Sequence, residues 1–489
     1  MKISRLMSTQ HPDNVSSPFF AQNHIISGDD EVKEAFYTYS HLDIDEQLWD
    51  AEGKEVDNFV IEKLLTRYSS FFQKNILGQN KFLTLRVPNP DVEKTQGKIL
   101  LESLNSIPRN FDLAKLFYQK EIAPIFEVVV PMCSSEKNLI RISQYYQKHI
   151  FGQQNCLTIN GDISLSQWLG EFGPPSIKVT PLFETKDAIV NSADYVEKYI
   201  QSEKIKEMQR VWFARSDPAL NYGSVAAVLL NKVGLIKLHE LQEKISIDIM
   251  PIIGCGSSPF RGNFKPTNIK NMVRGYPSIQ TFTAQSAFKY DFPLKKVLAG
   301  VEEINNIQRK EPYPVDIDQS LILIDKMEKD YGEAVRTLAP IINLVSKDIP
   351  PRRKRKLHVG LFGYARENQG VALPRAIKFC ASLYSLGLPP EIFGLSALNE
   401  KEIDQIRNCY PNLDQDMADA FQYFNKDNLS FFPQEIQRKV LPVLEKFNYE
   451  VNQEHQQATG KILSAIKKQD VLSVQENMLK AGHIRQFLG

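Results

Sequence analysis

The chain has 489 residues, of which 42% are hydrophobic and 24% charged, and its 59 Lys and Arg nearly balance its 58 Asp and Glu to leave a formal net charge of +1. These values are ordinary for a soluble globular protein, and they argue against a nucleic-acid partner held by a basic face. Five scattered cysteines without a C-x-x-C pair, and the lack of any run of about 18 apolar residues, predict a cytoplasmic protein with no disulfide framework, no thiolate zinc site and no membrane partner.

Short apolar runs rich in Val, Ile and Phe recur along the chain, and a helical stretch follows most of them. Such runs are typical of strands that are buried on both faces of a parallel sheet. The eight expected strands span residues 81–87, 125–132, 176–183, 210–215, 248–254, 278–285, 358–363 and 391–395. Helical patterns are expected between them, for example at 135–149, 186–202, 224–244 and 374–386. Eight strands that alternate with helices predict an α/β fold, a (β/α)8 TIM-type barrel.

The rest of the chain is expected to elaborate this barrel. Residues 1–80 are expected to form an N-terminal extension with one helix at 57–73. The barrel would occupy 81–400, with a helical insertion at 292–356 after the sixth strand, and 401–489 would form a C-terminal helical region. The whole chain, 1–489, is thus predicted to be one decorated barrel domain rather than the roughly three domains that its length alone suggests.

In a TIM-type barrel the active site lies at the carboxyl ends of the strands. Polar residues at or after the expected strand ends are therefore candidates for the site. They are Arg86, Glu184, Arg215, Asp217, the loop GCGSSPFRGN with Gly254, Gly256 and Arg261, then Lys289, Arg366 and Arg375. The set combines two carboxylates, several cationic side chains and a glycine-rich loop.

These residue types are suited to a divalent metal and an anionic substrate that carries phosphate or carboxylate groups. Mg²⁺ or Mn²⁺ takes one or two carboxylates and completes its coordination with water and substrate oxygens. Arginine pairs with phosphate and carboxylate through two parallel hydrogen bonds, and a glycine-rich loop presents backbone N–H groups to an oxyanion. Each residue also has a structural alternative: Glu184 or Asp217 could cap a helix or be a salt-bridge partner, the loop could be an inert turn, and any one arginine could be a solvated or ion-paired surface residue.

Two further segments stand outside the expected strand ends. His11, in STQHPDN, is either an ordinary loop residue or a group that moves a proton near neutral pH. The basic run RRKRK at 352–356 is expected to be a solvated stretch, because the net charge is +1 and no aromatic residues are interleaved with it.

Several of these motifs, taken in order, resemble those of phosphoenolpyruvate carboxylase, most closely the short, archaeal-type branch of that family. The motifs are STQHPDN, WDAEGKEVD, TLRVPNP, PLFET, ARSDPALNYG, PFRGN and FGYAREN followed by LPRAI. The resemblance runs from MSTQHPDN to the final IRQFLG and so covers nearly the whole chain. It implies an α/β barrel with added helices, a homotetramer, and the Mg²⁺- or Mn²⁺-dependent joining of bicarbonate to phosphoenolpyruvate, which gives oxaloacetate and phosphate.

The resemblance also implies roles for individual residues. By position, His11 is the catalytic histidine, Glu184 and Asp217 are metal ligands, and Arg86, Arg261 and Arg366 are catalytic arginines. Against the larger branch of the family, a loop histidine, a loop arginine and a lysine fall on Ile253, Cys255 and Leu220. Arg215, Lys289 and Arg375 would substitute for them in binding substrate, and Gly254 and Gly256 of the loop would bind substrate as well.

Three functions stay open on the sequence alone. As a carboxylase, the protein would use His11 as the base for the bicarbonate proton, and Gly489 would reach the site. The apolar strand-end residues Phe183, Phe213 and Ile253 would shield an enolate from water. The second function is that of another metal–enolate barrel enzyme, such as an aldol lyase or a phosphotransferase, and the absence of an obvious nucleotide loop counts against it. The third is a sensor that binds phosphoenolpyruvate without turnover.

Overall fold

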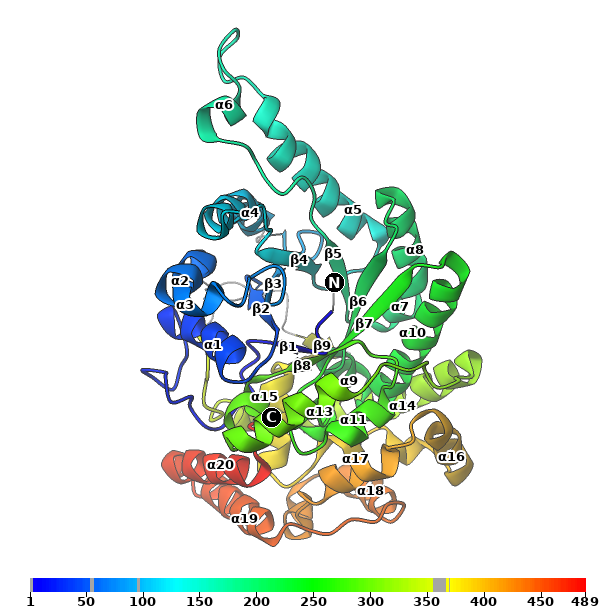
Figure 1. Cartoon of the computed structure of the whole chain (residues 1–489). Helices are drawn as coiled ribbons and strands as arrows, with labels where there is room; N and C mark the ends of the chain where they lie inside the picture. The colour runs from blue at the N-terminus through cyan, green and yellow to red at the C-terminus, as the bar shows by residue number, and fades with distance from the viewer. Residues whose placement is uncertain (1–2, 53–56, 95–96, 355–365, 369) are drawn as a thin grey trace.

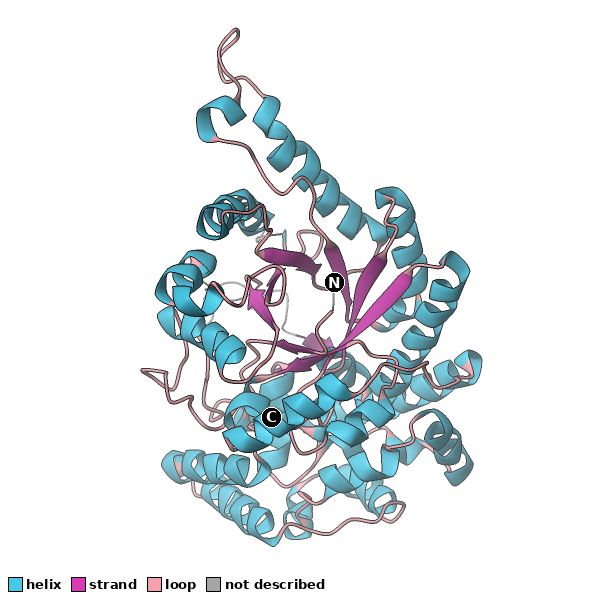
Figure 2. Ribbon diagram, viewed as in Figure 1, coloured by secondary structure: helices cyan, strands magenta, loops and turns pink. Residues whose placement is uncertain are grey.

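The computed structural model describes residues 3–52, 57–94, 97–354, 366–368 and 370–489. Within them the chain forms a closed barrel of eight parallel strands in sequence order, surrounded by helices (Figure 1, Figure 2). The strands are β1 (Leu6–Ser8), β2 (Glu46–Asp50), β3 (Phe82–Arg86), β4 (Ile125–Val130), β5 (Val179–Phe183), β6 (Met208–Ala214), β7 (Asp248–Gly254) and β8 (Thr281–Ala284). The barrel closes where β8 pairs with β1, with Leu6 opposite Phe282. The predicted (β/α)8 barrel is therefore confirmed.

Six of the expected strands are present, but the first two barrel strands are not where the apolar runs predict them. β1 and β2 lie within residues 1–80, so that segment belongs to the barrel and is not an extension of it. The expected strand at 391–395 is wrong, since Pro390–Ile392 forms a 3-10 turn (η5), and the expected strand at 358–363 lies outside the described residues. β1 has only three residues and β2, EQLWD, mixes polar with apolar residues, so neither gives a continuous apolar run.

Helices cover the outside of the barrel, and the C-terminal ones form a further group beside it, at the bottom of Figure 1. Up to the last barrel strand and just beyond it they are α1 (Asp29–Ser40), α2 (Val60–Arg67), α3 (Ser69–Phe72), α4 (Gly97–Tyr118), α5 (Glu136–Tyr145), α6 (Leu165–Leu169), α7 (Lys186–Val190), α8 (Ser192–Glu203), α9 (Ser216–Tyr222), α10 (Ser224–Ile245), α11 (Ile269–Gly275) and α12 (Ser286–Tyr290). They continue with α13 (Leu294–Asn306), α14 (Ile317–Val345), α15 (Ala376–Ser385), α16 (Glu400–Cys409), α17 (Leu413–Phe421), α18 (Gln434–Leu444), α19 (Gln453–Lys467) and α20 (Val471–Arg485).

The helices after β8 confirm one expectation and correct another. The predicted helical character of 401–489 is confirmed by α16 to α20. The expected insertion at 292–356 is helical too, with α13 and α14, but it follows the last barrel strand instead of separating two strands. A short antiparallel pair, β9 (Arg366–Asn368) and β10 (Val371–Leu373), precedes α15. No helix in the described part of the chain is long and apolar enough to cross a membrane.

The side chains inside the barrel lie in layers, because alternate residues of each strand point inward. The floor is polar and consists of Glu46, Thr84, Glu127, Thr180, Arg210 and Thr281, joined by hydrogen bonds. Above it lies an apolar layer of Met7, Leu48, Val129, Leu182, Trp212 and Ile252. The inward positions nearest the carboxyl ends of the strands are Asp50, Arg86, Glu184 and Gly254. Polar groups therefore return at the end of the barrel where the active site is expected.

Arg210 is the centre of the polar floor. Its Nη1 donates to Glu46 at 2.8 Å and to Glu127 at 2.7 Å, and its Nη2 donates to Thr281 at 3.2 Å. The three charged side chains are each at most 1% exposed. Burial opposes the charged form, but the Glu127 and Glu46 carboxylates outweigh it and raise the pKa of Arg210. The floor therefore depends on one guanidinium that compensates two buried carboxylates.

Replacement of Arg210 by Met should destabilise the barrel, because it leaves two carboxylates buried without their cation. Removing one partner from a buried pair costs about 3–5 kcal/mol, so the melting temperature in thermal unfolding should fall clearly. Lys244→Met is the matched control, since Lys244 pairs with Glu197 at 2.7 Å while 65% exposed and surface pairs contribute about 0–1 kcal/mol. Equal losses in the two variants would contradict a stabilising role for the floor.

Candidate active site

A cavity of about 480 Å³ opens at the carboxyl ends of the barrel strands. It gathers most of the predicted site residues, namely His11, Arg86, Glu184, Arg215, Asp217, Gly254, Arg261 and Arg375. Gly256 and Lys289 are not part of its wall. Arg366 begins β9, and its side chain lies outside the described part of the structure. One cavity thus brings together both predicted metal ligands, the histidine and four arginines.

Arg261 lies after β7 in a 3-10 turn, η4 (Pro259–Arg261), and its guanidinium is almost completely buried. Its Nε donates to Ser216 Oγ at 3.1 Å, and its Nη2 donates to Gln285 Oε1. Its Nη1 donates to Asp13 Oδ2 at 3.2 Å and to the Gly489 carbonyl oxygen at 2.9 Å. These contacts join the ends of β1, β6 and β8 to the last residue of the chain. Gly489 thus contacts Arg261 of the cavity wall, as predicted, but does not itself line the cavity.

Glycine at position 256 provides space for this guanidinium. A Cβ on Gly256 would lie 2.7 Å from Arg261 Nη1. The backbone N–H of Gly256 donates to the Arg261 carbonyl oxygen at 2.8 Å. This N–H is thus used within the loop, and Gly256 shapes the site without lining the cavity, so its predicted contact with substrate stays a prediction.

Arg86, the last residue of β3, is held by two acidic residues. Its Nε and Nη2 donate to the two carboxylate oxygens of Asp50 at 2.8 and 2.7 Å, and Nη2 lies 3.0 Å from Glu52 Oε2. Burial and the nearby Glu52 carboxylate raise the pKa of Glu93 to about 7. Glu52 lines the cavity, but the sequence pattern missed it because it follows a strand, β2, that gives no apolar run.

Glu184 and Asp217 are not helix caps, the structural alternative that their sequence positions allowed. The residue after Glu184, Thr185, caps α7, since its hydroxyl accepts a hydrogen bond from the Ala188 N–H at 3.3 Å. Asp217 lies inside the first turn of α9, whose capping position is Arg215. Both acidic residues line the cavity instead.

The two carboxylates fit a hard divalent cation. One carboxylate oxygen of Glu184 accepts from the Met132 N–H at 2.8 Å, which fixes the orientation of that side chain. Mg²⁺ or Mn²⁺ needs only one or two protein carboxylates, with water and substrate as the other ligands. In the described part of the chain no three His, Cys, Asp or Glu residues cluster as a metal site, so the donor set suits a cation shared with substrate and does not suit a closed structural site.

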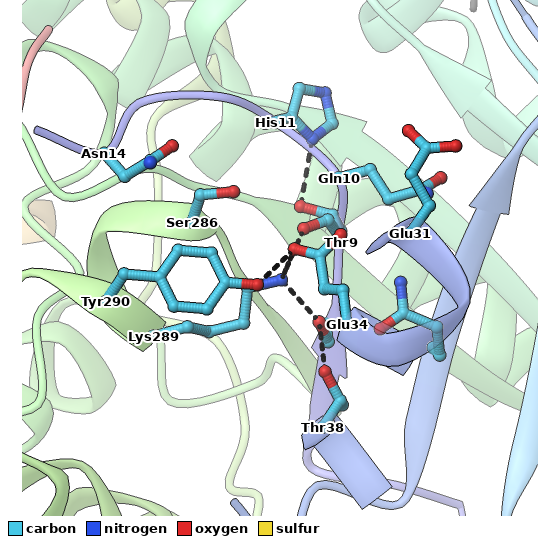
Figure 3. A network of polar contacts seen from close by, with 12 residues as sticks. Thr9, Gln10, His11, Asn14, Glu31, Glu34, Thr38, Ser286, Lys289 and Tyr290 are labelled. Carbon is cyan, nitrogen blue, oxygen red and sulfur yellow. Dashed lines mark hydrogen bonds and ion pairs between the residues drawn. The ribbon is translucent and has the colours of Figure 1, made fainter. Parts of the chain in front are cut away.

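His11 lies in the cavity wall just after β1 (Figure 3). Its Nδ1 is 2.9 Å from Thr9 Oγ1, and its carbonyl oxygen accepts from the Ser286 N–H at 3.2 Å. These contacts fix the backbone and the ring together. The hydrogen bond at Nδ1 couples the tautomer of the imidazole to Thr9.

Lys289 lies on α12 in a buried network with α1 and β1 (Figure 3). Its ammonium group donates to Ser8 Oγ and to the Thr9 carbonyl oxygen at 3.0 Å each, and to Glu34 Oε1 at 2.7 Å. Three acceptors satisfy its three N–H groups, and both side chains of the ion pair are fully buried. The predicted contact with substrate stays a prediction, and Lys289 lies outside the cavity wall. It holds the segment that carries His11 against α1.

The prediction of a solvated basic run at 352–356 is wrong for its first two residues. Arg352 and Arg353 are 6% and 5% exposed and line the cavity. Arg353 Nη2 donates to both carboxylate oxygens of Glu34, at 2.5 and 2.6 Å. Burial alone would raise the pKa of Glu34, but Arg353 and the neighbouring ammonium group lower it to about 2. The sequence gives no sign of this pairing because the partners are 319 residues apart.

Arg215 is buried next to the loop residue that replaces an arginine of the larger branch. Its Nη2 donates to Ser224 Oγ at 3.0 Å, whereas its Nε and Nη1 have no hydrogen-bond partner in the described part of the chain. A Cβ built on Gly262 would lie 2.7 Å from Cys255 Cβ and 3.6 Å from Arg215 Cγ. The stem of Arg215 therefore runs close to Cys255.

The apolar wall of the cavity differs from the one predicted. Phe183, Phe213 and Ile253 belong to the outer core, between the strands and the helices. The residues that line the cavity are their neighbours in sequence, Leu182, Trp212, Ala214 and Gly254. A shift of one residue along a strand moves a side chain to the opposite face, which explains the correction.

Comparisons with known proteins find relatives along the whole chain. A family model described as phosphoenolpyruvate carboxylase matches residues 3–489. A phosphoenolpyruvate carboxylase of Methanospirillum hungatei is 47% identical over 489 residues, which is 100% of both chains. One of Pyrococcus furiosus is 50% identical over 424 residues, 86% of this chain and 89% of that protein. A solved malate synthase of Haloferax volcanii, in complex with pyruvate and acetyl-CoA, overlaps 67% of this chain and 80% of its own, but a TM-score of 0.35 at 8% identity is too low to carry weight.

Replacement of Glu93 by Gln should stabilise the protein above pH 7 and not below about pH 4.5. The pKa of Glu93 is raised from 4.5 to about 7 in the folded state, so between pH 4.5 and 7 the folded protein keeps a proton on Glu93 that the unfolded chain releases. The free energy of unfolding therefore falls as the pH rises from 4.5 to 7. Gln imitates the protonated side chain and removes the loss, which is at most about 3 kcal/mol. Melting temperatures from pH 4.5 to 8.5 measure the effect, with the exposed Glu102→Gln as control. A difference between Glu93→Gln and wild type that does not change with pH would contradict the assignment.

Proposed function

The chain belongs to the phosphoenolpyruvate carboxylase family, and on that premise we propose that it is a carboxy-lyase that joins bicarbonate to phosphoenolpyruvate and releases oxaloacetate and phosphate. The observation that carries the proposal is the single cavity in which Glu184 and Asp217 face several cationic side chains. Phosphoenolpyruvate has a phosphate and a carboxylate group, and arginines match both. The loss of phosphate makes the reaction irreversible, so it would supply four-carbon acids.

We propose that Glu184 and Asp217 hold the Mg²⁺ or Mn²⁺ ion that the family requires. The support is the chemistry of the donors: both are hard oxygen ligands, both line the cavity, and neither is used as a helix cap. When bound, the cation would supply positive charge opposite the negative charge that develops on the enol oxygen of the substrate.

The reaction would begin with transfer of the phosphoryl group to bicarbonate. The bond from phosphorus to the enol oxygen breaks, and a bond from phosphorus to a bicarbonate oxygen forms, which gives an enolate and carboxyphosphate. Carboxyphosphate splits into carbon dioxide and phosphate, and the enolate carbon attacks the carbon dioxide to form oxaloacetate. Arg86, Arg261 and Arg366 would hold the phosphate oxygens, so that their work is positioning and charge compensation.

Other residues of the cavity would bind bicarbonate, transfer its proton and protect the enolate from water. We propose that His11 takes the proton of bicarbonate and returns it to the departing phosphate. Arg215 and Arg375 would bind the bicarbonate and carboxyphosphate oxygens. Leu182 and Trp212, which line the cavity, would exclude the water that could protonate the enolate to pyruvate.

We also expect a homotetramer that works in the cytoplasm. The first expectation comes from the family resemblance, and the second comes from the odd number of scattered cysteines. Neither affects the chemistry assigned to the cavity.

Asp217→Asn should abolish most of the oxaloacetate-forming activity while the protein stays folded. A metal ligand that is lost should lower kcat/KM by at least about 100-fold, with a higher Mg²⁺ concentration needed for half-maximal rate. Asp187→Asn is the matched control, because Asp187 is an exposed acidic residue in the first turn of α7, outside the cavity. A coupled assay with phosphoenolpyruvate, bicarbonate and Mg²⁺ measures both variants.

Two outcomes of this assay would contradict the proposal. Asp217→Asn with nearly wild-type kcat/KM would show that the carboxylate is not a metal ligand. Wild-type protein that binds phosphoenolpyruvate but forms no oxaloacetate would instead indicate a sensor.

A further inference from the structure

A segment between α5 and β5 projects from the body of the protein, at the top of Figure 1. α5 continues into a π-helical turn, η2 (Tyr146–Phe151), and the chain then forms η3 (Gly152–Asn155), a loop and α6 before it returns to the barrel. We call residues 151–172 the arm. The structure describes all of these residues, and none of them is buried. Only Phe151, at the base of the arm, packs against the hydrophobic core of its own chain, so the arm adds little to that core.

The arm is ordered by its own polar contacts. Ser164 and Gln167 form a reciprocal capping box at the start of α6. The Leu165 N–H donates to the Cys156 carbonyl oxygen at 2.9 Å, and Leu157 forms an isolated β-bridge with Ser164. Fixing a backbone costs about 1–2 kcal/mol per residue in conformational entropy, and no residue of the arm is buried within the chain to offset this cost.

Five large apolar side chains of the arm are exposed. Their exposed fractions are 50% for Leu157, 66% for Ile159, 47% for Ile163, 64% for Trp168 and 58% for Leu169. Charges are scarce in this part of the chain: Asp162 and Glu171 are the only charged residues between 150 and 177, against 24% in the whole sequence. Exposed apolar clusters and charge depletion are both features of the central part of a protein–protein interface.

We infer that the arm is a contact surface between copies of this chain. Two identical arms can face each other with little like-charge repulsion, because each has only two charged residues. A two-fold contact would use every apolar side chain twice. At roughly 100 Å² for each of the five side chains, two arms together would bury about 1,000 Å², the lower limit of a specific interface. Burial of this area against a second copy supplies the stabilisation that the isolated arm lacks.

The decisive experiment measures the mass of the full-length protein in solution as a function of its concentration. Wild type should sediment as a multiple of the 55.9 kDa chain. Trp168→Ser combined with Leu169→Ser should raise the dissociation constant of the assembly at least 10-fold. Leu472→Ser on α20 is the matched control, since Leu472 is 79% exposed outside the arm, and it should leave the mass unchanged.

Trp168 provides a second measurement on the unmodified protein. All three tryptophans lie in the described part of the chain, and Trp49 and Trp212 are only 2% exposed. Quenching of tryptophan fluorescence by acrylamide therefore reports mainly on Trp168. Quenching should be weak at concentrations where the protein is assembled and should increase on dilution as copies separate.

Three results would overturn the inference. The first is a wild type that stays monomeric at micromolar concentration with Trp168 open to acrylamide. The second is an assembly whose mass and dissociation constant the double variant leaves unchanged. The third applies if Trp168→Ser with Leu169→Ser lowers the melting temperature, because weaker assembly could then result from partial unfolding. In that case a second double variant at the other end of the arm, Leu157→Ser with Ile159→Ser, is measured. An unchanged dissociation constant for this second variant contradicts the inference. The mass and the fluorescence quenching are measured without substrate. A failure of this inference can therefore be distinguished from a failure of the proposed carboxylase activity.

Discussion

The buried guanidinium of Arg261 fixes the arrangement of the segments that follow the barrel strands at their carboxyl ends. A cation removed from water is tolerated only when its N–H groups find acceptors, and here those acceptors come from four distant parts of the chain. They are Asp13 after β1, Ser216 after β6, Gln285 after β8, and Gly489. Each of these contacts places a loop that also carries another residue of the cavity wall. The same charge that is expected to meet phosphate thus holds together the site around it.

The layered interior of the barrel explains why the site lies at one end only. The polar floor around Arg210 is closed by its own ion pairs, and the apolar layer above it separates this charge from the cavity. The charged groups at the carboxyl ends of the strands are therefore separated from the floor by this apolar layer. The same apolar layer reaches the cavity through Leu182 and Trp212, so one set of side chains both packs the barrel and forms part of the cavity wall.

The sequence predicted the barrel and many of the residues that line its cavity, because most strands are apolar runs that are followed by polar residues. Glu184 and Asp217 were identifiable on this basis, since Glu184 directly follows β5 and Asp217 comes three residues after the end of β6. β1 and β2 were missed because one is very short and the other carries inward-facing acids. Lys289 and Arg353 depend on Glu34, far away in sequence, and a charge buried by a distant partner looks like a solvated charge in a sequence. Such pairings become visible only when the fold is known.

We propose that this cavity transfers phosphate from phosphoenolpyruvate to bicarbonate and then joins the resulting carbon dioxide to the enolate. The most direct measurement is the fate of the oxygen atoms of bicarbonate fully labelled with ¹⁸O, followed by mass spectrometry of both products. Transfer to bicarbonate predicts one ¹⁸O atom in phosphate and two in the new carboxylate of oxaloacetate. Phosphate that contains no ¹⁸O, or phosphate released with pyruvate and without oxaloacetate, would contradict it.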